Sequence, residues 1–254
     1  MKNISNQERF YKAKEKIIGI ERPRNQIGTL SEKTMHAVVK NYYEMDENYQ
    51  EIPIEGKCAD IFTKDEKIIE IQTRSWNLLK PKLQVFLPSY DVTVVLPIPD
   101  HKQIIWIDPD TGEVGKPGPN RKYGNPYMLF NELYKIREFL TNTNMHVHVL
   151  MIDVLEYKLL SGRSKDRKKF GAERYDRIPI NLTSEINLEI PEDYMQFIPD
   201  NLPEKFTAKD FAKSAGTSER LTGYIIGTLK VLGLIEKIGQ TSRRAYIYRV
   251  KEIQ

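Results

Sequence analysis

The residues best suited to chemistry are Asp60, Glu70 and Gln72, which lie on two short segments joined by a tight turn. The segments Cys58–Phe62 and 67–74 have the alternation of a strand hairpin, with the turn at 63–66. Side chains alternate between the two faces of a strand, so the carboxylates and the amide are predicted to share one face. The other face takes Ile61, Ile69 and Ile71. Two carboxylates on adjacent strands are hard oxygen ligands that suit Mg²⁺ or Mn²⁺.

The flanking segments predict the elements that position this hairpin. A helix after Ser31 is indicated by apolar residues at helical spacing, a first strand by 51–56, and a second helix by Leu79, Leu83 and Phe86. Pro81 marks the start of that second helix or a kink in it. The nearly continuous apolar run 91–99 is typical of a strand buried on both faces. The helical spacing after Ser31 is carried by Met35, Val38, Val39 and Tyr42.

This order of helix, three strands, helix and strand, with Glu32 on the first helix, Asp60 and then Glu70-x-Gln72, resembles the PD-(D/E)XK nuclease superfamily. The resemblance covers roughly residues 29–99. It implies an α/β fold with a restriction-endonuclease-like mixed sheet flanked by helices. It also implies Mg²⁺- or Mn²⁺-dependent hydrolysis of DNA phosphodiesters, with the metal held by Asp60 and Glu70. Glu32 then contacts a second metal or a water molecule.

The sequence departs from that superfamily at Gln72, where lysine is the commonest residue. An amide supplies no positive charge and does not readily accept a proton, so Gln72 is expected to orient the attacking water. Some restriction enzymes recruit a lysine from the following helix, and Lys80 and Lys82 are placed for that role. Two other interpretations stay open: a hairpin whose exposed face is acidic, and a nuclease fold that has lost catalysis and serves a DNA-binding regulator or scaffold.

The last fifty residues resemble a winged-helix domain. Thr207 and Asp210 form a capping-box pattern, Gly216 a turn, and Thr217 or Ser218 the start of a second helix that ends at Gly233. Two strands follow, around a turn at 239–244. Basic residues outnumber acidic ones here, which suits DNA, although winged helices also dock proteins. The candidate groove contacts on the second helix are Arg220 and Lys230, and the candidate wing contacts are Arg243 and Arg244.

Between these two parts the pattern is less regular. A hairpin is expected over 103–114, helices over 5–19 and 126–140, and a strand over 145–160. The loop 115–126 carries Arg121 and Lys122, and the basic segment 161–177 carries Lys168 and Lys169. Each of these two segments suits either DNA contact or a solvated loop. The proline-containing stretch 178–203 is expected to be an extended connector. The expected domains are 1–180, a connector at 181–202, and 203–254.

Two further residue patterns have competing interpretations. His146 and His148 fall on one face of an expected strand, where they either ligate a metal or form the polar side of that strand. Cys58 is the one cysteine of the chain and is expected to be a small packing residue, since a single cysteine excludes an internal disulfide and a cysteine-rich zinc site.

Composition sets the outer limits. The chain has 254 residues, a formal net charge of +4 and 40% hydrophobic residues, which fits one large domain or two modest ones. The mild basic excess fits a DNA partner. No apolar run approaches the length needed to span a bilayer, and the first residues lack a signal-peptide core, so a cytoplasmic protein without a membrane partner is expected. Enzymes that the nuclease-like part resembles often act as homodimers, because one site cuts one strand.

Overall fold

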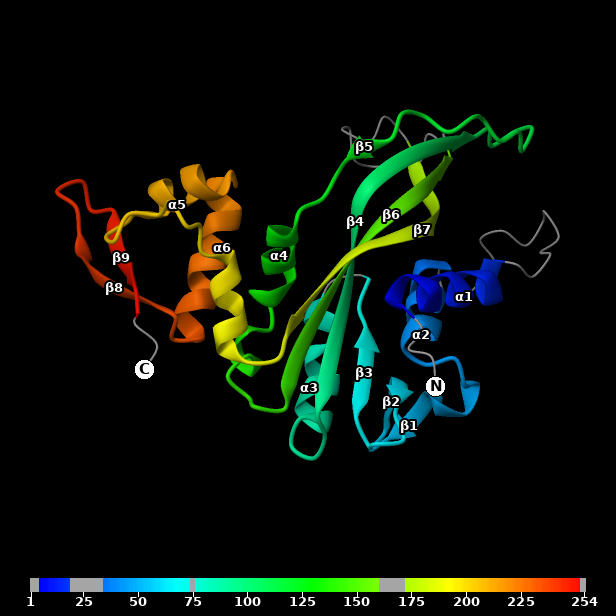
Figure 1. The fold of residues 1–254 in the computed structure, drawn as a ribbon, viewed down its shortest axis with the longest axis horizontal. Helices are drawn as coiled ribbons and strands as arrows, with labels where there is room; N and C mark the ends of the chain where they lie inside the picture. The colour runs from blue at the N-terminus through cyan, green and yellow to red at the C-terminus, as the bar shows by residue number, and fades with distance from the viewer. Residues whose placement is uncertain (1–4, 19–33, 74–75, 160–171, 252–254) are drawn as a thin grey trace. The chain divides into compact units, whose positions relative to one another are not determined.

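A computed structural model describes residues 5–18, 34–73, 76–159 and 172–251. These residues form an α/β protein with a mixed sheet and flanking helices (Figure 1). The chain divides into two compact units that interleave in sequence: residues 1–52, 97–125 and 150–185 form the first, and residues 53–96, 126–149 and 186–254 form the second. Within the described residues, no helix is long and apolar enough to cross a membrane.

The main sheet of the described chain has seven strands in the order β1-β2-β3-β4-β6-β7, with β5 paired to β4 outside this path. β2 and β3 are antiparallel, whereas β3 and β4 are parallel. A mixed sheet was expected, and the parallel pair requires the crossover helix that lies between these two strands in the chain. The strands are β1 (Gln50–Ile54), β2 (Lys57–Phe62), β3 (Ile68–Ile71), β4 (Val92–Ile107), β5 (Arg121–Lys122), β6 (Met145–Leu159) and β7 (Glu173–Leu188).

Two tight turns fix the register of the first three strands. Glu55 and Gly56 connect β1 to β2 with positive φ at both positions, 48° and 76°, as two-residue hairpin loops require. Between β2 and β3, the Thr63 amide donates to the Lys67 carbonyl at 2.8 Å, which closes the predicted turn. The resulting register sets Ile61 opposite Ile69. A slip by one residue would move every side chain of the hairpin to the other face.

Three prolines lie in the long strands β4 and β7. Pro97 and Pro99 fall between the part of β4 that pairs with β3, which ends near Val95, and the part that pairs with β5 from His101 onward. Pro179 lies in β7, which is the last strand in the sheet order. The expected strand 91–99 therefore continues to Ile107, and the expected connector was wrong over 178–188, which is strand.

The expected hairpin over 103–114 is present in an open form. The Gly112 amide donates to the Asp108 carbonyl at 2.9 Å, and Asp108 Oδ1 accepts from the amides of Asp110 and Thr111. This is the turn chemistry predicted for the segment. Beyond the turn, an isolated bridge joins Ile107 to Val114.

Helices of the first unit pack on its part of β7. α1 (Asn6–Ile18) and α2 (Thr34–Tyr43) bury Phe10 against Tyr42, with ring centroids 5.9 Å apart. Lys14 Nζ donates to the Ile180 carbonyl at 3.2 Å. A short 3-10 turn, η2 (Glu47–Tyr49), leads into β1. Both helices were predicted from their apolar spacing.

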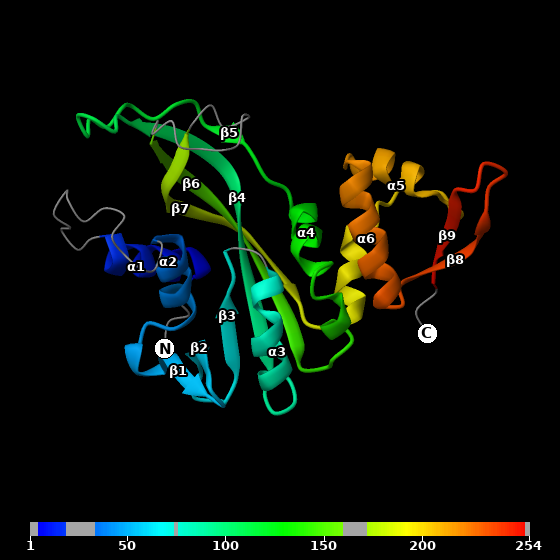
Figure 2. The ribbon, with the colours of Figure 1, turned by 180° about the vertical axis from the view of Figure 1, so that it is seen from behind.

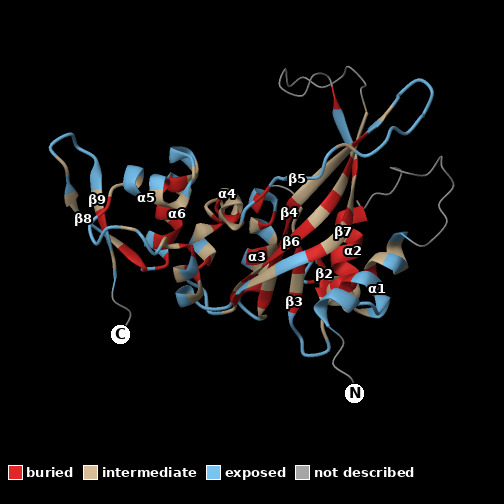
Figure 3. Cartoon of the chain, turned by 45° about the horizontal axis from the view of Figure 1, so that its top comes forward, coloured by how far each residue is buried: buried red, intermediate tan, exposed pale blue. Residues whose placement is uncertain are grey.

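Helices of the second unit include the crossover helix α3 (Lys80–Phe86), preceded by η3 (Trp76–Leu78). Leu79, just before the helix, and Leu83 and Phe86 within it form a stripe that is fully buried. Figure 3 colours buried residues red. The expected helix 126–140 is instead three short pieces. These are η4 (Pro126–Leu129), α4 (Phe130–Leu133) and η5 (Arg137–Phe139). A further 3-10 helix, η7 (Pro191–Phe197), comes after β7.

The C-terminal helices and strands appear in the predicted order: α5 (Ala208–Ala215), α6 (Glu219–Val231), β8 (Ile235–Gln240) and β9 (Tyr246–Val250). Thr207 and Asp210 form the capping box, Gly216 ends α5 with φ 62°, and Ser218 caps α6. Local sequence thus specified these boundaries correctly.

Helix α6 lies beside α4 within the second unit (Figures 1 and 2). The rings of Tyr134 and Tyr224 are 4.8 Å apart, and a Cβ at Gly227 would lie 2.6 Å from Cε2 of Tyr134. The guanidinium carbon of Arg137 also lies over the Tyr134 ring, 4.2 Å from its centre. Gly227 is therefore required for the close approach of α6 to Tyr134.

Replacement of Gly227 by alanine is expected to destabilise the protein relative to the same change at Gly223, which has open space around it. Alanine at Gly223 gains up to about 1 kcal/mol of helix propensity. Alanine at Gly227 must also displace a packed ring, at a cost of roughly 1–3 kcal/mol. Urea unfolding of both variants measures the difference; equal stabilities would contradict the packing.

Candidate active site

Asp60 and Glu70 face each other across the β2–β3 hairpin. Glu70 Oε1 accepts from the Asp60 amide at 3.3 Å, and Asp60 Oδ2 accepts from the Ile71 amide at 2.7 Å. Each carboxylate is thus held by the backbone of the opposite strand. The hairpin register, set by its turns, is what brings the two acids together.

Lys82 completes the cluster from the start of α3. Its Nζ lies 2.7 Å from Glu70 Oε2 and 3.8 Å from Asp60 Oδ1. The next residue, Leu83, is fully buried, which anchors this turn of the helix. Lys80, the other candidate, pairs with Glu138 at 2.5 Å instead. The structure therefore brings only Lys82, of the two predicted lysines, to the carboxylates.

Burial gives this cluster unusual electrostatics. Glu70 is 1% exposed, so its side chain is not part of an exposed acidic face. Cys58, two residues before Asp60, is exposed. Burial, and then the charge of Asp60, raise the pKa of Glu70 to about 7 against the opposing effect of Lys82. Burial lowers the pKa of Lys82, but Glu70 and Asp60 outweigh it and leave that pKa raised. A positive charge is therefore favoured beside these carboxylates.

The remaining predicted catalytic residues have different positions. Gln72 directly follows β3 and is half-buried. Its backbone N–H donates to the Val95 carbonyl at 2.9 Å, which keeps the residue beside β4. Glu32 lies outside the described residues, as do Lys168 and Lys169. The expectation that Cys58 packs in the interior was wrong, because the alternation of β2 turns Ala59 and Ile61 inward.

The candidate DNA contacts are spread over several elements. Arg121 and Lys122 form β5, and Lys122 Nζ contacts Asp100. Arg220 donates from Nε to the Tyr224 hydroxyl at 3.1 Å, on the side of α6 that carries the contact with Tyr134. Lys230 is exposed at the end of α6. Arg243 and Arg244 are exposed in the β8–β9 turn, where Arg244 has φ 64°.

His146 and His148 share a carboxylate that their own spacing does not predict. His146 Nδ1 lies 3.0 Å from Glu189 Oε2, and His148 Nε2 lies 2.6 Å from Glu189 Oε1. Glu189 directly follows β7, so only the pairing of β6 with β7 places it there. The interpretation of these histidines as the polar side of β6 fits this contact.

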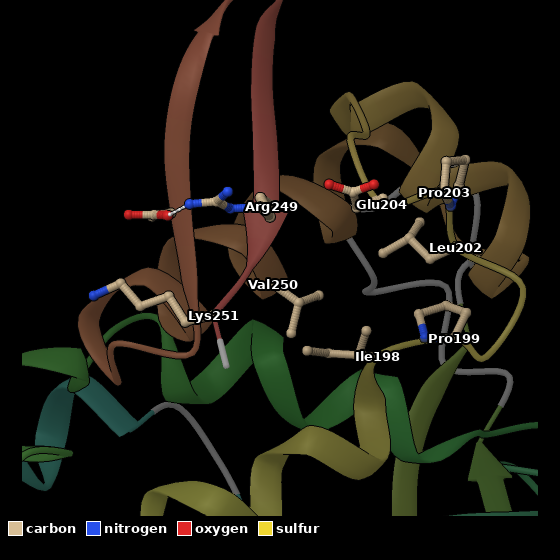
Figure 4. A pocket seen from close by; sticks show the side chains of 9 residues that line it. Ile198, Pro199, Leu202, Pro203, Glu204, Arg249, Val250 and Lys251 are labelled. Atoms are coloured by element: carbon tan, nitrogen blue, oxygen red, sulfur yellow. Dashed lines mark hydrogen bonds and ion pairs between the residues drawn. The ribbon is translucent and has the colours of Figure 1, made fainter. Parts of the chain in front are cut away.

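A pocket of about 560 Å³ lies elsewhere in the second unit, between the segment 198–204 and the β8–β9 sheet (Figure 4). Its wall includes Ile198, Leu202 and Val250, and an ion pair between Glu236 and Arg249 at 2.6 Å. None of its lining residues belongs to the Asp60 cluster.

The fold and the buried cluster define an α/β protein with a charged site on a strand hairpin. The chain belongs to the family described as "Domain of unknown function (DUF8091)", which matches residues 33–189. That range includes Asp60, Glu70 and Lys82. A protein of Treponema pallidum (strain Nichols), described as "Uncharacterized protein", is 25% identical over 190 residues, or 74% of each chain. No solved structure matches.

The raised pKa of Glu70 predicts how stability depends on pH in metal-free buffer. The folded chain holds the Glu70 proton more tightly than the unfolded chain, whose value is 4.5, so this contribution is complete below 4.5 and is lost as pH rises to about 7. The shift corresponds to a loss on the order of 3 kcal/mol. Urea unfolding from pH 4.5 to 8 measures it.

Glu70→Gln should flatten this decline, because an amide does not titrate. Glu138→Gln is the matched control. The hydrogen bond from Lys80 lowers the pKa of Glu138 despite its burial, so its contribution is lost only as pH falls, and this variant should decline between pH 4.5 and 8 as the wild type does. A wild-type protein whose stability is constant over this range would contradict a raised pKa at Glu70.

Proposed function

We propose that this protein is a metal-dependent deoxyribonuclease that hydrolyses phosphodiester bonds at Asp60 and Glu70. The observation that carries the proposal is the convergence of two carboxylates and one lysine, with Lys82 Nζ 2.7 Å from Glu70. Hydrolysis of a phosphodiester needs oxygen ligands for a divalent ion and a cation for the developing negative charge. The cluster has both kinds of group.

The donor set fits Mg²⁺ or Mn²⁺, because these ions take carboxylate oxygens. Two carboxylates this close favour a bound cation. Burial first, and then the charge of Asp60, raise the pKa of Glu70, so a cation there would favour its charged form. When bound by Asp60 and Glu70, the ion would lower the pKa of a water molecule and screen charge on the phosphate. The hydrogen bonds from Ile71 and Asp60 hold the two side chains in place.

Lys82 supplies the positive charge that Gln72 lacks. Its ammonium contacts Glu70 from α3, so it takes the place of the lysine that the superfamily usually carries at position 72. Gln72, at the end of β3, is the residue assigned to orient the attacking water. Order along the chain supports the nuclease-like assignment, because α2, β1, β2, β3, α3 and β4 follow the succession that the resemblance implies.

The C-terminal helices and strands support a winged-helix assignment for 203–254. Two helices are followed by a two-stranded sheet whose turn carries Arg243 and Arg244. Because α6 packs on α4 through Tyr224 and Gly227, the wing is the better candidate for DNA contact. We assign phosphate contacts to the two arginines of the turn.

A non-catalytic DNA-binding scaffold is the second candidate. The observation that favours it is the ion pair between Lys82 and Glu70, which stabilises the buried carboxylate without any metal. In that case the cluster is a structural ion pair. Cleavage assays separate the two candidates.

Purified protein with Mg²⁺ or Mn²⁺ should nick supercoiled plasmid, and Asp60→Asn or Glu70→Gln should abolish nicking. Lys82→Ala should lower turnover by about a hundredfold, equivalent to roughly 3 kcal/mol of transition-state stabilisation. Lys80→Ala is the matched control and should cut at the wild-type rate, since Lys80 pairs with Glu138. Equal nicking by all variants would indicate a contaminant, and no nicking by any would favour the scaffold.

Replacing Arg243 and Arg244 together by alanine should weaken binding to duplex DNA similarly for unrelated sequences. Loss of two phosphate contacts should flatten the slope of log affinity against log salt by roughly two. Arg249→Ala is the control, because Arg249 is paired with Glu236. Fluorescence anisotropy over a salt series measures these slopes; an unchanged slope in the double variant would refute the wing assignment.

A further inference from the structure

We infer that the first unit holds a separate site for a first-row divalent transition metal, formed by Asp100, His101 and Asp153. One ligand atom from each residue lies within 4.8 Å of the other two, and no second group of this kind occurs in the part of the chain that was described. Asp100 and His101 lie on β4, and Asp153 lies on β6. The site shares no residue with the Asp60 cluster.

Two of the three separations between the ligand atoms match those of a coordination sphere, and the third is within 4.8 Å. His101 Nδ1 lies 3.0 Å from Asp153 Oδ1 and 3.3 Å from Asp100 Oδ2. Ligand atoms about 2.1 Å from one ion lie roughly 3.0 to 3.4 Å from each other in octahedral and tetrahedral sites. One imidazole nitrogen therefore already lies between two carboxylate oxygens at the separations that one ion would require.

Hydrogen bonding alone satisfies this arrangement only in part. Nδ1 carries at most one proton, yet it faces two carboxylates, and Asp153 Oδ1 also accepts from the His101 amide at 3.2 Å. A cation bound by Nδ1 would instead interact favourably with both acids. One imidazole with two carboxylates suits Mn²⁺, Fe²⁺, Co²⁺ or Zn²⁺ better than Mg²⁺ or Ca²⁺.

Lys122 is the cation that competes with a metal for the charge of Asp100, through the other carboxylate oxygen, Oδ1. Its Nζ contacts Asp100, and its side chain is 61% exposed, so it can move into solvent at little cost. Asp100 itself is buried, with 7% of its surface exposed. The His101 side chain is 38% exposed, so the cluster can be reached from solvent.

The test is a titration of the full chain carrying Asp60→Asn and Glu70→Gln with Co²⁺, followed by visible absorption and calorimetry. This background removes the site of the proposed nuclease, so the two proposals can fail separately. One Co²⁺ per chain should bind and give the absorption of a nitrogen-ligated ion. His101→Gln or Asp153→Asn should weaken binding at least roughly tenfold.

Two further variants make the outcome decisive. Lys122→Met should tighten Co²⁺ binding roughly two- to fivefold, because an exposed ion pair contributes up to about 1 kcal/mol. His148→Gln is the matched control and should leave binding unchanged. The proposal is overturned if no Co²⁺ binds, if His148→Gln alone removes binding, or if Lys122→Met binds Co²⁺ no more tightly; that last comparison decides even if His101→Gln does not fold.

Discussion

The buried carboxylate of Glu70 is the constraint on which the candidate site depends. A charge removed from water needs partners, and the structure provides the Asp60 amide on one side and the Lys82 ammonium on the other. Asp60 is close enough to raise the pKa of Glu70, so the two acids cannot both be charged at low cost without a cation. Lys82 is that cation in the described structure. The same electrostatics would favour a divalent ion.

This constraint explains how the surrounding elements are built. The hairpin turns set the register that opposes Asp60 to Glu70, and the parallel pairing of β3 with β4 requires a crossover containing α3. Burial of Leu79, Leu83 and Phe86 then fixes the rotation of α3 about its axis. Lys82 reaches the carboxylates because that rotation is fixed. The burial that stabilises the core therefore also places the Lys82 ammonium beside the carboxylates.

The two sites we propose differ in chemistry in a way that their surroundings explain. The Asp60 cluster offers only oxygen ligands and already contains a lysine, which suits a hard ion and an anionic substrate. The Asp100 cluster adds an imidazole, and its competing lysine is largely exposed. Both lie in the part of the chain that matches the family, residues 33–189. The C-terminal helices and strands lie outside that range.

Local pattern alone determined the strand hairpin, the C-terminal helices and the two carboxylates of the candidate site. The hairpin of β2 and β3, the caps at Thr207 and Ser218, and the shared face of Asp60 and Glu70 follow from turn chemistry, capping and alternation, which act over a few residues. Tertiary structure decided between Lys80 and Lys82. These lysines lie on opposite sides of the buried stripe of α3, at similar angles from it, so helical periodicity cannot choose between them.

Local sequence pattern also could not predict contacts between strands that are distant in sequence. Glu189 joins His146 and His148, and Asp153 joins His101, only through the pairing of neighbouring strands in the sheet. The prolines of 178–203 suggested a connector, yet Pro179 is accommodated because β7 is an edge strand. The spacing of residues in a single sequence indicates only which residues are close within one helix, strand or turn. Contacts across the sheet depend on which strands pair, and that is decided by the burial of the whole core.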